Sequence, residues 1–239
     1  MTRRCFIVIG RPRSGTTLLA DSLNQHPEIV CHDEVFHYDR SLRKKYGPNG
    51  VAFEDGGDAA AYLEQHIFSK PEKFCGFKML YDQARKTNLR ECLKSKPDLV
   101  VFHLIRDNTL ACEASGAAAY ATGKWHTHRQ GWPDHEPQVE LDYHQLRRQF
   151  CIHDACYRET EHCFRRNQIV RVLYEDLVSS FAESMARFYE ALGASPFVPE
   201  MRVKKMSQKP LRERVGNWEE LKAAFSDTLY ARFFDADNS

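Results

Sequence analysis

The chain has 239 residues, and its 34 lysines and arginines nearly balance its 33 aspartates and glutamates, which leaves a formal net charge of +1. This length provides for one large α/β domain with its own hydrophobic core. The balanced charge argues against a broad basic face of the kind that binds duplex nucleic acid, so we expect any anion site to be local.

The first apolar stretch, Cys5–Ile9, is too short for a signal peptide and is followed by no small-residue cleavage site. No run approaches the length of apolar sequence that a membrane span requires, so we expect none. The eight cysteines include no Cys-x-x-Cys pair, which indicates reduced, mostly buried thiols and a cytoplasmic protein. The oligomeric state stays open, a homodimer included.

Continuous apolar runs are typical of parallel strands that are buried on both faces. They occur at Cys5–Ile9, Phe74–Leu80, Leu99–Ile105 and Ile169–Leu173. Helix-like stretches alternate with them, at Thr16–Gln25, at Asn108–Tyr120 with Asp107 or Asn108 as its cap, and from a capping box at Ser180–Glu183 to Leu192 with Gly193 after it. This alternation predicts an α/β fold of three layers, a mostly parallel central sheet flanked by helices, in a single domain over residues 1–239.

Two regions interrupt the alternation. Residues 46–58 hold four glycines and a proline, which predicts a mobile loop. Residues 122–141 are rich in aromatic residues and histidines, as are many loops that cover a site. Within this second loop, Trp125 and Trp132 are candidates to stack on the face of a bound sugar.

The strongest motif follows the first strand directly and opens a helix. It reads Gly10-Arg11-Pro12-Arg13-Ser14-Gly15-Thr16-Thr17. A glycine-bearing turn at this place exposes backbone N–H groups at the positive end of a helix, which suits an oxyanion. The glycine spacing is that of a P-loop, but Thr16 stands where a nucleoside-triphosphate kinase needs its lysine, and the positive charge comes from Arg11 and Arg13 instead.

The same segment resembles the loop with which sulfotransferases bind the 5′-phosphosulfate of 3′-phosphoadenosine 5′-phosphosulfate (PAPS). That loop reads basic-Ser-Gly-Thr-Thr, as Arg13–Thr17 do here. The resemblance implies a P-loop-like fold and transfer of a sulfuryl group from PAPS to a hydroxyl of a carbohydrate or other small molecule, with 3′,5′-ADP as the product. Arg11–Thr17 would bind the cofactor, and Arg13 would stabilise the charge that builds on the bridging oxygen. Because the cations are side chains, no metal ion is expected.

Two further segments resemble the family's binding site for the 3′-phosphate. Arg106 follows the run that ends at Ile105 and matches the family's arginine. Ser115 takes the place of the serine on the next helix, although it comes nine residues later where eight is usual. Near the C-terminus, Arg212 or Arg214 takes the place of a cation ahead of Gly216-Asn217-Trp218.

Three other segments add to the resemblance. Tyr174, in Tyr174-Glu175-Asp176-Leu177, matches a residue that lies near the nucleotide. Ile105–Leu110 and Tyr230–Phe234 resemble the small bacterial carbohydrate sulfotransferases of the nodulation-factor type. The resemblance implies sulfuryl transfer as the reaction, but it does not identify the acceptor.

An acceptor hydroxyl needs a base, and the residues after the first helix predict a short second strand that ends at the same sheet edge as the phosphate loop. In the carbohydrate and tyrosyl-protein branches a glutamate at this place is the base, and Glu34 matches it. His32 and His37 are rival bases, since histidine serves in the steroid and phenol branch. Lys78 lies within an apolar run, where a lysine needs a partner, and its ammonium is expected to face the sulfuryl oxygens.

Three alternatives remain beside this interpretation. An ATP-dependent small-molecule kinase could use the same fold, and so could a nucleotide-binding module without catalytic activity. Lys78 could also be a solvated lysine at the end of its strand. A metal site is not expected, because the helix that carries Cys151, His153, Cys156, His162 and Cys163 lacks the spacing of known zinc sites.

Overall fold

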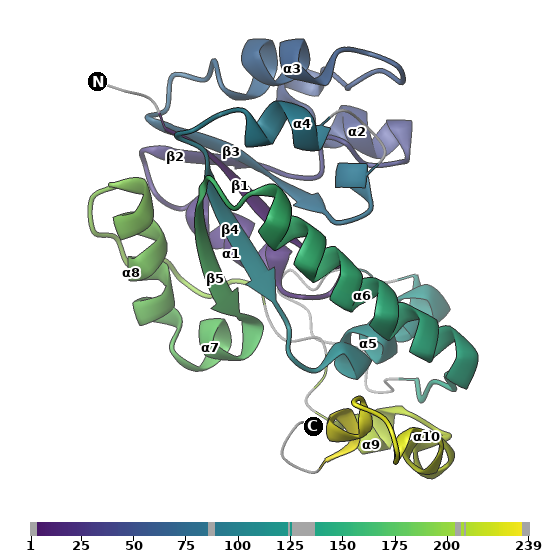
Figure 1. Ribbon diagram of the computed structural model, residues 1–239. Coiled ribbons are helices and arrows are strands. Elements are labelled where there is room, and N and C mark those ends of the chain that lie inside the picture. Colours follow the sequence, from purple (N-terminus) through teal and green to yellow (C-terminus); the bar gives the residue numbers. More distant parts are fainter. Residues whose placement is uncertain are drawn as a thin grey trace. The chain divides into compact units, whose positions relative to one another are not determined.

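A computed structural model describes residues 4–85, 89–123, 125, 137–203, 207 and 209–235. The chain divides into two compact units, each made of two stretches (Figure 1). We call Met1–Ile105 with Arg158–Met201 the sheet unit, and Arg106–Tyr157 with Arg202–Ser239 the helical unit. The single domain over residues 1–239 stays a prediction.

The sheet unit contains five parallel strands in the order β2-β3-β1-β4-β5. They are β1 Arg4–Gly10, β2 Ile29–His32, β3 Phe74–Leu80, β4 Val100–Ile105 and β5 Gln168–Leu173. Each of the four apolar runs forms a strand, and the short second strand is present as well. The predicted parallel sheet is therefore confirmed.

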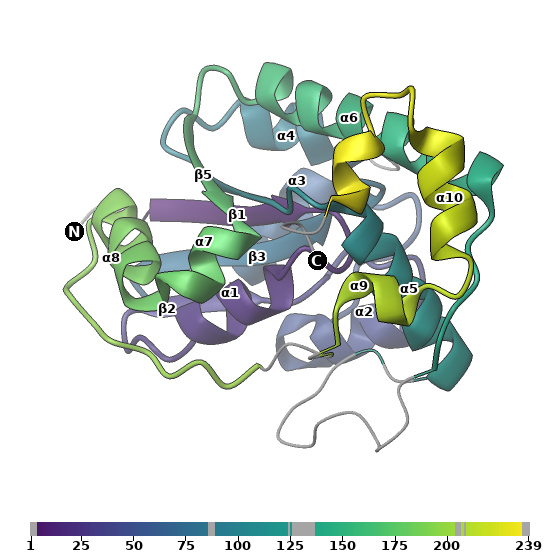
Figure 2. The same ribbon diagram turned by 90° about the horizontal axis from the view of Figure 1, so that it is seen from below.

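Helices cover both faces of this sheet, which confirms the predicted layers (Figure 2). The longer elements of the unit are α1 Thr16–Leu23, α2 Arg40–Tyr46, α3 Ala59–Tyr62, η2 Leu63–Ile67, α4 Leu89–Lys94, α7 Tyr174–Ser179 and α8 Phe181–Leu192. On one face, Phe188 of α8 packs against Phe102 of β4 with ring centroids 4.8 Å apart. On the other face, Phe77 of β3 packs toward Phe36 and Phe68.

The helix boundaries follow most of the predicted signals. The side chain of Asn108 caps α5 by accepting a hydrogen bond from Ala111 N at 3.1 Å, and Gly193 ends α8 in the left-handed region at φ 74°. The capping box at Ser180 is wrong, because the Ser180 side chain makes no cap hydrogen bond. Ser180 is also the residue that ends α7, and its N–H donates to Asp176 O at 2.9 Å. The same residue therefore serves as the C-cap of α7 and the N-cap of α8.

Residues 46–58, within the sheet unit, include a short 3-10 helix, η1 Pro48–Gly50, and pack against neighbouring residues of that unit. Phe53 is buried with its ring centroid 4.8 Å from that of Phe36. Arg43 of α2 binds both carboxylate oxygens of Asp55 at 2.6 and 2.9 Å. The predicted mobility of this loop stays a prediction.

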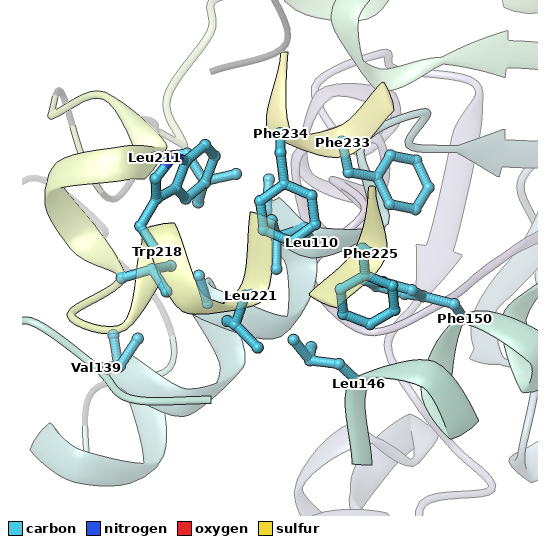
Figure 3. Packing of buried hydrophobic residues seen from close by; sticks show 14 residues of the cluster. Leu110, Val139, Leu146, Phe150, Leu211, Trp218, Leu221, Phe225, Phe233 and Phe234 are labelled. Atoms are coloured by element: carbon cyan, nitrogen blue, oxygen red, sulfur yellow. The ribbon is translucent and has the colours of Figure 1, made fainter. Parts of the chain in front are cut away.

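The helical unit is built around one cluster of apolar side chains (Figure 3). Its elements are α5 Thr109–Thr122, the part of α6 Tyr143–Cys163 that ends at Tyr157, α9 Leu211–Arg214, α10 Trp218–Phe225 and η4 Ala231–Phe234. Val139 forms a parallel bridge with Val215, and the Asn217 side chain continues it by bonding to both backbone groups of Leu141 at 2.9 and 3.1 Å. Of the helices in the described residues, none is both long and apolar enough to cross a membrane.

The face of the sheet on which His32 lies follows from the register. His32 pairs with Phe77, and neighbouring residues of a strand point to opposite faces, so His32 and Lys78 lie on opposite faces of the sheet. Burial, with a smaller contribution from Lys70, lowers the pKa of His32 to about 4. His32 is therefore neutral at pH 7.

We predict that Phe225→Ala lowers the free energy of unfolding by about 3–5 kcal/mol, because it opens a cavity at the centre of the apolar cluster, where Phe225 is fully buried. Denaturant unfolding measures the loss, and Phe225→Leu, which keeps most of the apolar volume, should lose less. A loss below about 1 kcal/mol for the alanine variant would mean that this cluster contributes little to stability.

We also predict that the free energy of unfolding falls as the pH drops from about 6.5 toward 4. Over this range an unfolded chain protonates His32, while the folded chain, in which the pKa of His32 is about 4, keeps it neutral. Acid therefore favours the unfolded state. Urea unfolding at several pH values should show a shallower decline for His32→Phe than for the wild type, and parallel curves would contradict the assignment.

Candidate active site

The phosphate loop leaves the carboxyl end of β1, the central strand of the sheet, where ligands of open parallel sheets bind. A Cβ atom at Gly10 would lie 2.7 Å from Leu104 O and 2.8 Å from Ser14 Oγ, so only glycine fits there. Arg13 adopts a φ of 67°, a conformation that non-glycine residues rarely hold and that occurs often at functional sites. The hydroxyl of Ser14 donates to Arg11 O at 2.8 Å and braces the loop from within.

The first turn of α1 faces the end of this loop without a side-chain cap. Its N-cap is Gly15, in the left-handed region at φ 90°. The first N–H groups of a helix have no partner within the helix, so those of Thr16 and Thr17 are suited to an anion. Within the loop, Arg11, Ser14 and Thr16 are buried, Arg13, Gly15 and Thr17 are partly exposed, and Pro12 is exposed.

Tyr174, the first residue of α7, lies against the loop. A Cβ atom at Gly15 would come within 2.5 Å of the Tyr174 ring. The resemblance implies a tyrosine near the nucleotide, and the structure brings this tyrosine to the glycine at the start of α1. Gly15 is thus required both by its positive φ and by the close approach of an aromatic ring.

Lys78 is the most buried charged residue of the site, with 2% of its side chain exposed. Its Nζ lies 2.7 Å from Asp33 Oδ1 and 3.0 Å from Glu34 Oε1. The same Nζ donates to Thr17 Oγ1, in the first turn of α1, at 3.0 Å. Lys78 therefore links the phosphate loop to two carboxylates, and the interpretation as a solvated lysine is wrong.

The charge of Lys78 is maintained by its partners. Burial by itself lowers the pKa of the ammonium, but the negative charges and hydrogen bonds of Asp33 and Glu34 outweigh burial and leave the pKa raised. A buried ammonium with two carboxylates and a hydroxyl around it is fully paired. The site consequently holds a fixed positive charge beside the phosphate loop.

Glu34 is held at both carboxylate oxygens. Lys78 binds Oε1, and Gln83 Nε2 donates to Oε2 at 2.6 Å. Gln83 is itself buried, and its Oε1 accepts a hydrogen bond from Leu80 N at the end of β3 at 3.2 Å. The side chain of Glu34 is 13% exposed and that of Asp33 is 36% exposed, so both remain open to an acceptor.

Sequence reasoning missed three residues of this group. Asp33 is the acidic neighbour of Glu34, and that proximity was the available signal. Gln83 lies in the short helix η3 Gln83–Arg85, and nothing in the sequence distinguishes it from a surface glutamine. Tyr46 of α2 is partly buried, and burial together with the negative charges of Asp33 and Glu34 raises the pKa of its hydroxyl.

The two candidate histidines differ in their position relative to Glu34. His32 is on the opposite face of the sheet, and its Nε2 is buried without a hydrogen-bond partner in the described part of the chain. His37 follows the turn after Glu34, with its backbone N–H donating to Glu34 O at 2.9 Å. The Nδ1 atom of His37 accepts a hydrogen bond from Asp39 N at 3.0 Å.

The remaining candidates belong to the helical unit. Arg106 is partly exposed just before α5, and Ser115 is buried within α5. On α9, Arg212 is exposed and lines a shallow pocket of about 410 Å³, while Arg214 is buried. Trp125 is 39% exposed, with its ring centroid 4.6 Å from that of Tyr120. Trp132 lies outside the described residues.

No group of three or more histidine, cysteine, aspartate and glutamate side chains in the described ranges is arranged to hold a metal ion. On α6, His153 is nearly buried and lies 3.4 Å from Thr109 Oγ1 through its Nδ1 atom. Cys156 is buried with the apolar side chains of that helix.

Comparisons with known proteins agree with this geometry. The family model described as "Sulfotransferase family" matches residues 6–94, which include the phosphate loop, the two carboxylates, Lys78 and Gln83. The chain is similar to nodulation protein H of Rhizobium meliloti (strain 1021), with 25% identity over 244 residues that cover 98% of this chain and 96% of the relative. It is equally similar to nodulation protein H of Rhizobium tropici, with 25% identity over 241 residues that cover 98% and 94%.

A solved structure shares the fold. The crystal structure of a sulfotransferase from Alicyclobacillus acidocaldarius superimposes with a TM-score of 0.54 and 18% identity, and the match covers 100% of this chain and 96% of that chain. The phosphate loop on a parallel sheet, the matching family model and the full-length relatives lead to one conclusion. The chain is similar to the enzymes of the sulfotransferase family, over residues 6–94 by the family model and over nearly its whole length by the relatives.

Proposed function

We propose that this enzyme transfers the sulfuryl group of PAPS to a hydroxyl group of a carbohydrate acceptor, with Glu34 as the base. The contacts of Lys78 carry this proposal. A single buried ammonium touches the helix that begins at the phosphate loop and the two carboxylates that could take a proton. Transfer of a charged group needs a cation and a base beside one another, and little covalent chemistry from the protein.

The phosphate loop fits the 5′-phosphosulfate end of PAPS. Gly10 and Gly15 have no room for a side chain, which lets the backbone approach an anion closely. The free N–H groups at the start of α1 and the guanidinium of Arg13 would hold the phosphate oxygens. When bound, PAPS would supply the sulfuryl group and a phosphate leaving group at this loop.

The roles of Arg106, Ser115, Arg212 and Arg214 follow from the family resemblance. Arg106 and Ser115 would bind the 3′-phosphate, with Arg212 or Arg214 as a second cation. Guanidinium groups are well suited to this task because they bind phosphate oxygens in pairs and keep their charge at any physiological pH. Tyr174 would lie beside the nucleotide, as its contact with Gly15 supports.

Glu34 is the better base of the two carboxylates. A carboxylate offers about four lone-pair sites, so the bonds to Lys78 and Gln83 leave room to accept the proton of an acceptor hydroxyl. Gln83 and Lys78 each bind one oxygen of the carboxylate and together fix its orientation. Asp33 has the same contact to Lys78 but no second side chain that orients it among the described residues.

A carbohydrate acceptor is supported by two features of the chain. Ile105–Leu110 and Tyr230–Phe234 resemble carbohydrate sulfotransferases of the nodulation-factor type. Tyr120 and Trp125 form an exposed aromatic pair at the end of α5, and aromatic faces are common binding surfaces for sugar rings. His37 and Tyr46, which flank the carboxylates, are further candidates for contact with the acceptor.

We predict that Glu34→Gln lowers turnover by about 10²–10⁴-fold, because the amide cannot take the proton of the acceptor. The affinity for 3′,5′-ADP should barely change. Transfer of labelled sulfate from PAPS to a carbohydrate acceptor measures the first quantity, and calorimetry measures the second.

Asp33→Asn is the matched control, since it removes the same charge from the same ammonium. It should keep most of the turnover. The reverse result, with Asp33→Asn inactive and Glu34→Gln active, would assign the base to Asp33. Full turnover in Glu34→Gln would remove Glu34 from the mechanism.

We further predict that Arg106→Ala weakens the binding of 3′,5′-ADP by about 1.5–3 kcal/mol, the value of one charge-assisted hydrogen bond. The affinity for 5′-AMP should not change, because this ligand lacks the 3′-phosphate. Arg232→Ala, which removes an exposed arginine that pairs with Asp107 at 3.0 Å, serves as the control and should leave both affinities as they are. Equal losses for both nucleotides would contradict the role of Arg106.

A further inference from the structure

A chain of hydrogen-bonded polar side chains leads from the interior of the sheet unit to its surface. Tyr81 Oη lies 2.6 Å from His103 Nε2, and His103 Nδ1 lies 2.7 Å from Glu161 Oε1. Arg171 Nε then donates to Glu161 Oε2 at 2.9 Å. Tyr81 is 4% exposed and His103 is completely buried, so their contact forms in the interior, whereas Glu161 is partly exposed and Arg171 is exposed. None of the four residues has a role in the proposed chemistry.

The direction of the hydrogen bonds follows from the charges. The ionised carboxylate of Glu161 can only accept, so His103 donates its Nδ1–H to Glu161, and its Nε2 accepts a hydrogen bond from the Tyr81 hydroxyl. Burial lowers the pKa of His103 in spite of the opposing effect of Glu161, which agrees with a neutral ring. The Tyr81 hydroxyl and both ring nitrogens of His103 therefore each have a hydrogen-bond partner.

We call the hydrogen-bonded side chains of Tyr81, His103, Glu161 and Arg171 the relay. Its Tyr81 end lies at the start of the phosphate loop. The backbone N–H of Tyr81 donates to Gly10 O at 3.1 Å, and Gly10 is the last residue of β1. His103 pairs with Ile9 in the sheet, and the carbonyl of the next residue, Leu104, packs against Gly10. Two members of the relay thus hold the strands on either side of the residue where the loop begins.

The same segment also leads to the base. Gln83 follows Tyr81 by two residues and bonds both to Leu80 N and to Glu34 Oε2. A shift of Tyr81 would therefore displace Gly10 on one side, and on the other side Gln83, which orients Glu34. Buried hydrogen-bonded networks of this kind hold their surroundings in one arrangement.

We infer that Tyr81, held by His103 and Glu161, is a positioning residue that fixes the start of the phosphate loop and the Gln83–Glu34 contact relative to each other. This role deepens the proposed function and rests on it. It requires that loss of the Tyr81 hydroxyl loosens the end of β3 and weakens the binding of nucleotide, beyond any general loss of stability.

The test compares Tyr81→Phe with Tyr62→Phe. Tyr62 is a suitable match because it is also buried in the sheet unit and donates to a backbone oxygen, Val51 O, at 3.0 Å. Both variants lose one buried tyrosine hydroxyl. Amide hydrogen exchange of Leu80 and Tyr81, read by nuclear magnetic resonance without any nucleotide, reports directly on the end of β3.

We expect exchange at these two amides to be about tenfold faster or more in Tyr81→Phe and unchanged in Tyr62→Phe. Affinity for 3′,5′-ADP should fall by about fivefold or more in the first variant alone. Unchanged exchange and unchanged affinity in Tyr81→Phe would overturn the inference, and so would equal effects in both variants.

A second variant keeps the test decisive if Tyr81→Phe does not fold. Glu161→Gln keeps an acceptor for His103 at a partly exposed position and should change exchange and affinity in the same direction. No effect on either quantity would overturn the inference. If wild-type protein fails to bind 3′,5′-ADP, the proposed function fails, whereas the exchange measurement still decides whether the relay holds the loop.

Discussion

The site depends on the pairing of the buried Lys78 ammonium with its partners. An unpaired charge in the interior of a protein is very costly, so the fold must bring partners to it. Those partners come from two other parts of the chain, Thr17 at the start of α1 and the carboxylates of Asp33 and Glu34 after β2. The need to pair one cation thus holds three segments together, namely β3, the start of α1 and the residues after β2.

The parallel sheet supplies the geometry for that arrangement. The carboxyl ends of β1, β2 and β3 lie at one edge, because the three strands are parallel neighbours in the order β2-β3-β1. The phosphate loop follows β1, Asp33 and Glu34 follow β2, and Gln83 follows β3. A loop that binds an anion and a pair that can accept a proton consequently meet at the same edge, as ligand sites in open α/β sheets do.

Much of the fold could be predicted from the sequence, because the buried strands are continuous apolar runs with loops and helices between them. Lys78 could be identified as a candidate because it is a charged residue within one of these apolar runs. The capping box at Ser180 failed because that residue ends one helix and begins another, and a local pattern carries no information on such sharing. Gln83, Tyr46 and the relay through His103 could not be found, because their contacts join residues that are distant in sequence and are created only when the strands assemble.

The most direct test of the account is calorimetric titration of the wild-type enzyme with 3′,5′-ADP, with 5′-AMP and with ATP plus Mg²⁺. A PAPS-dependent sulfotransferase should bind the bisphosphate at least about tenfold more tightly than 5′-AMP, because only the bisphosphate carries the second phosphate. Binding of ATP with Mg²⁺ in the absence of binding of 3′,5′-ADP would contradict the account.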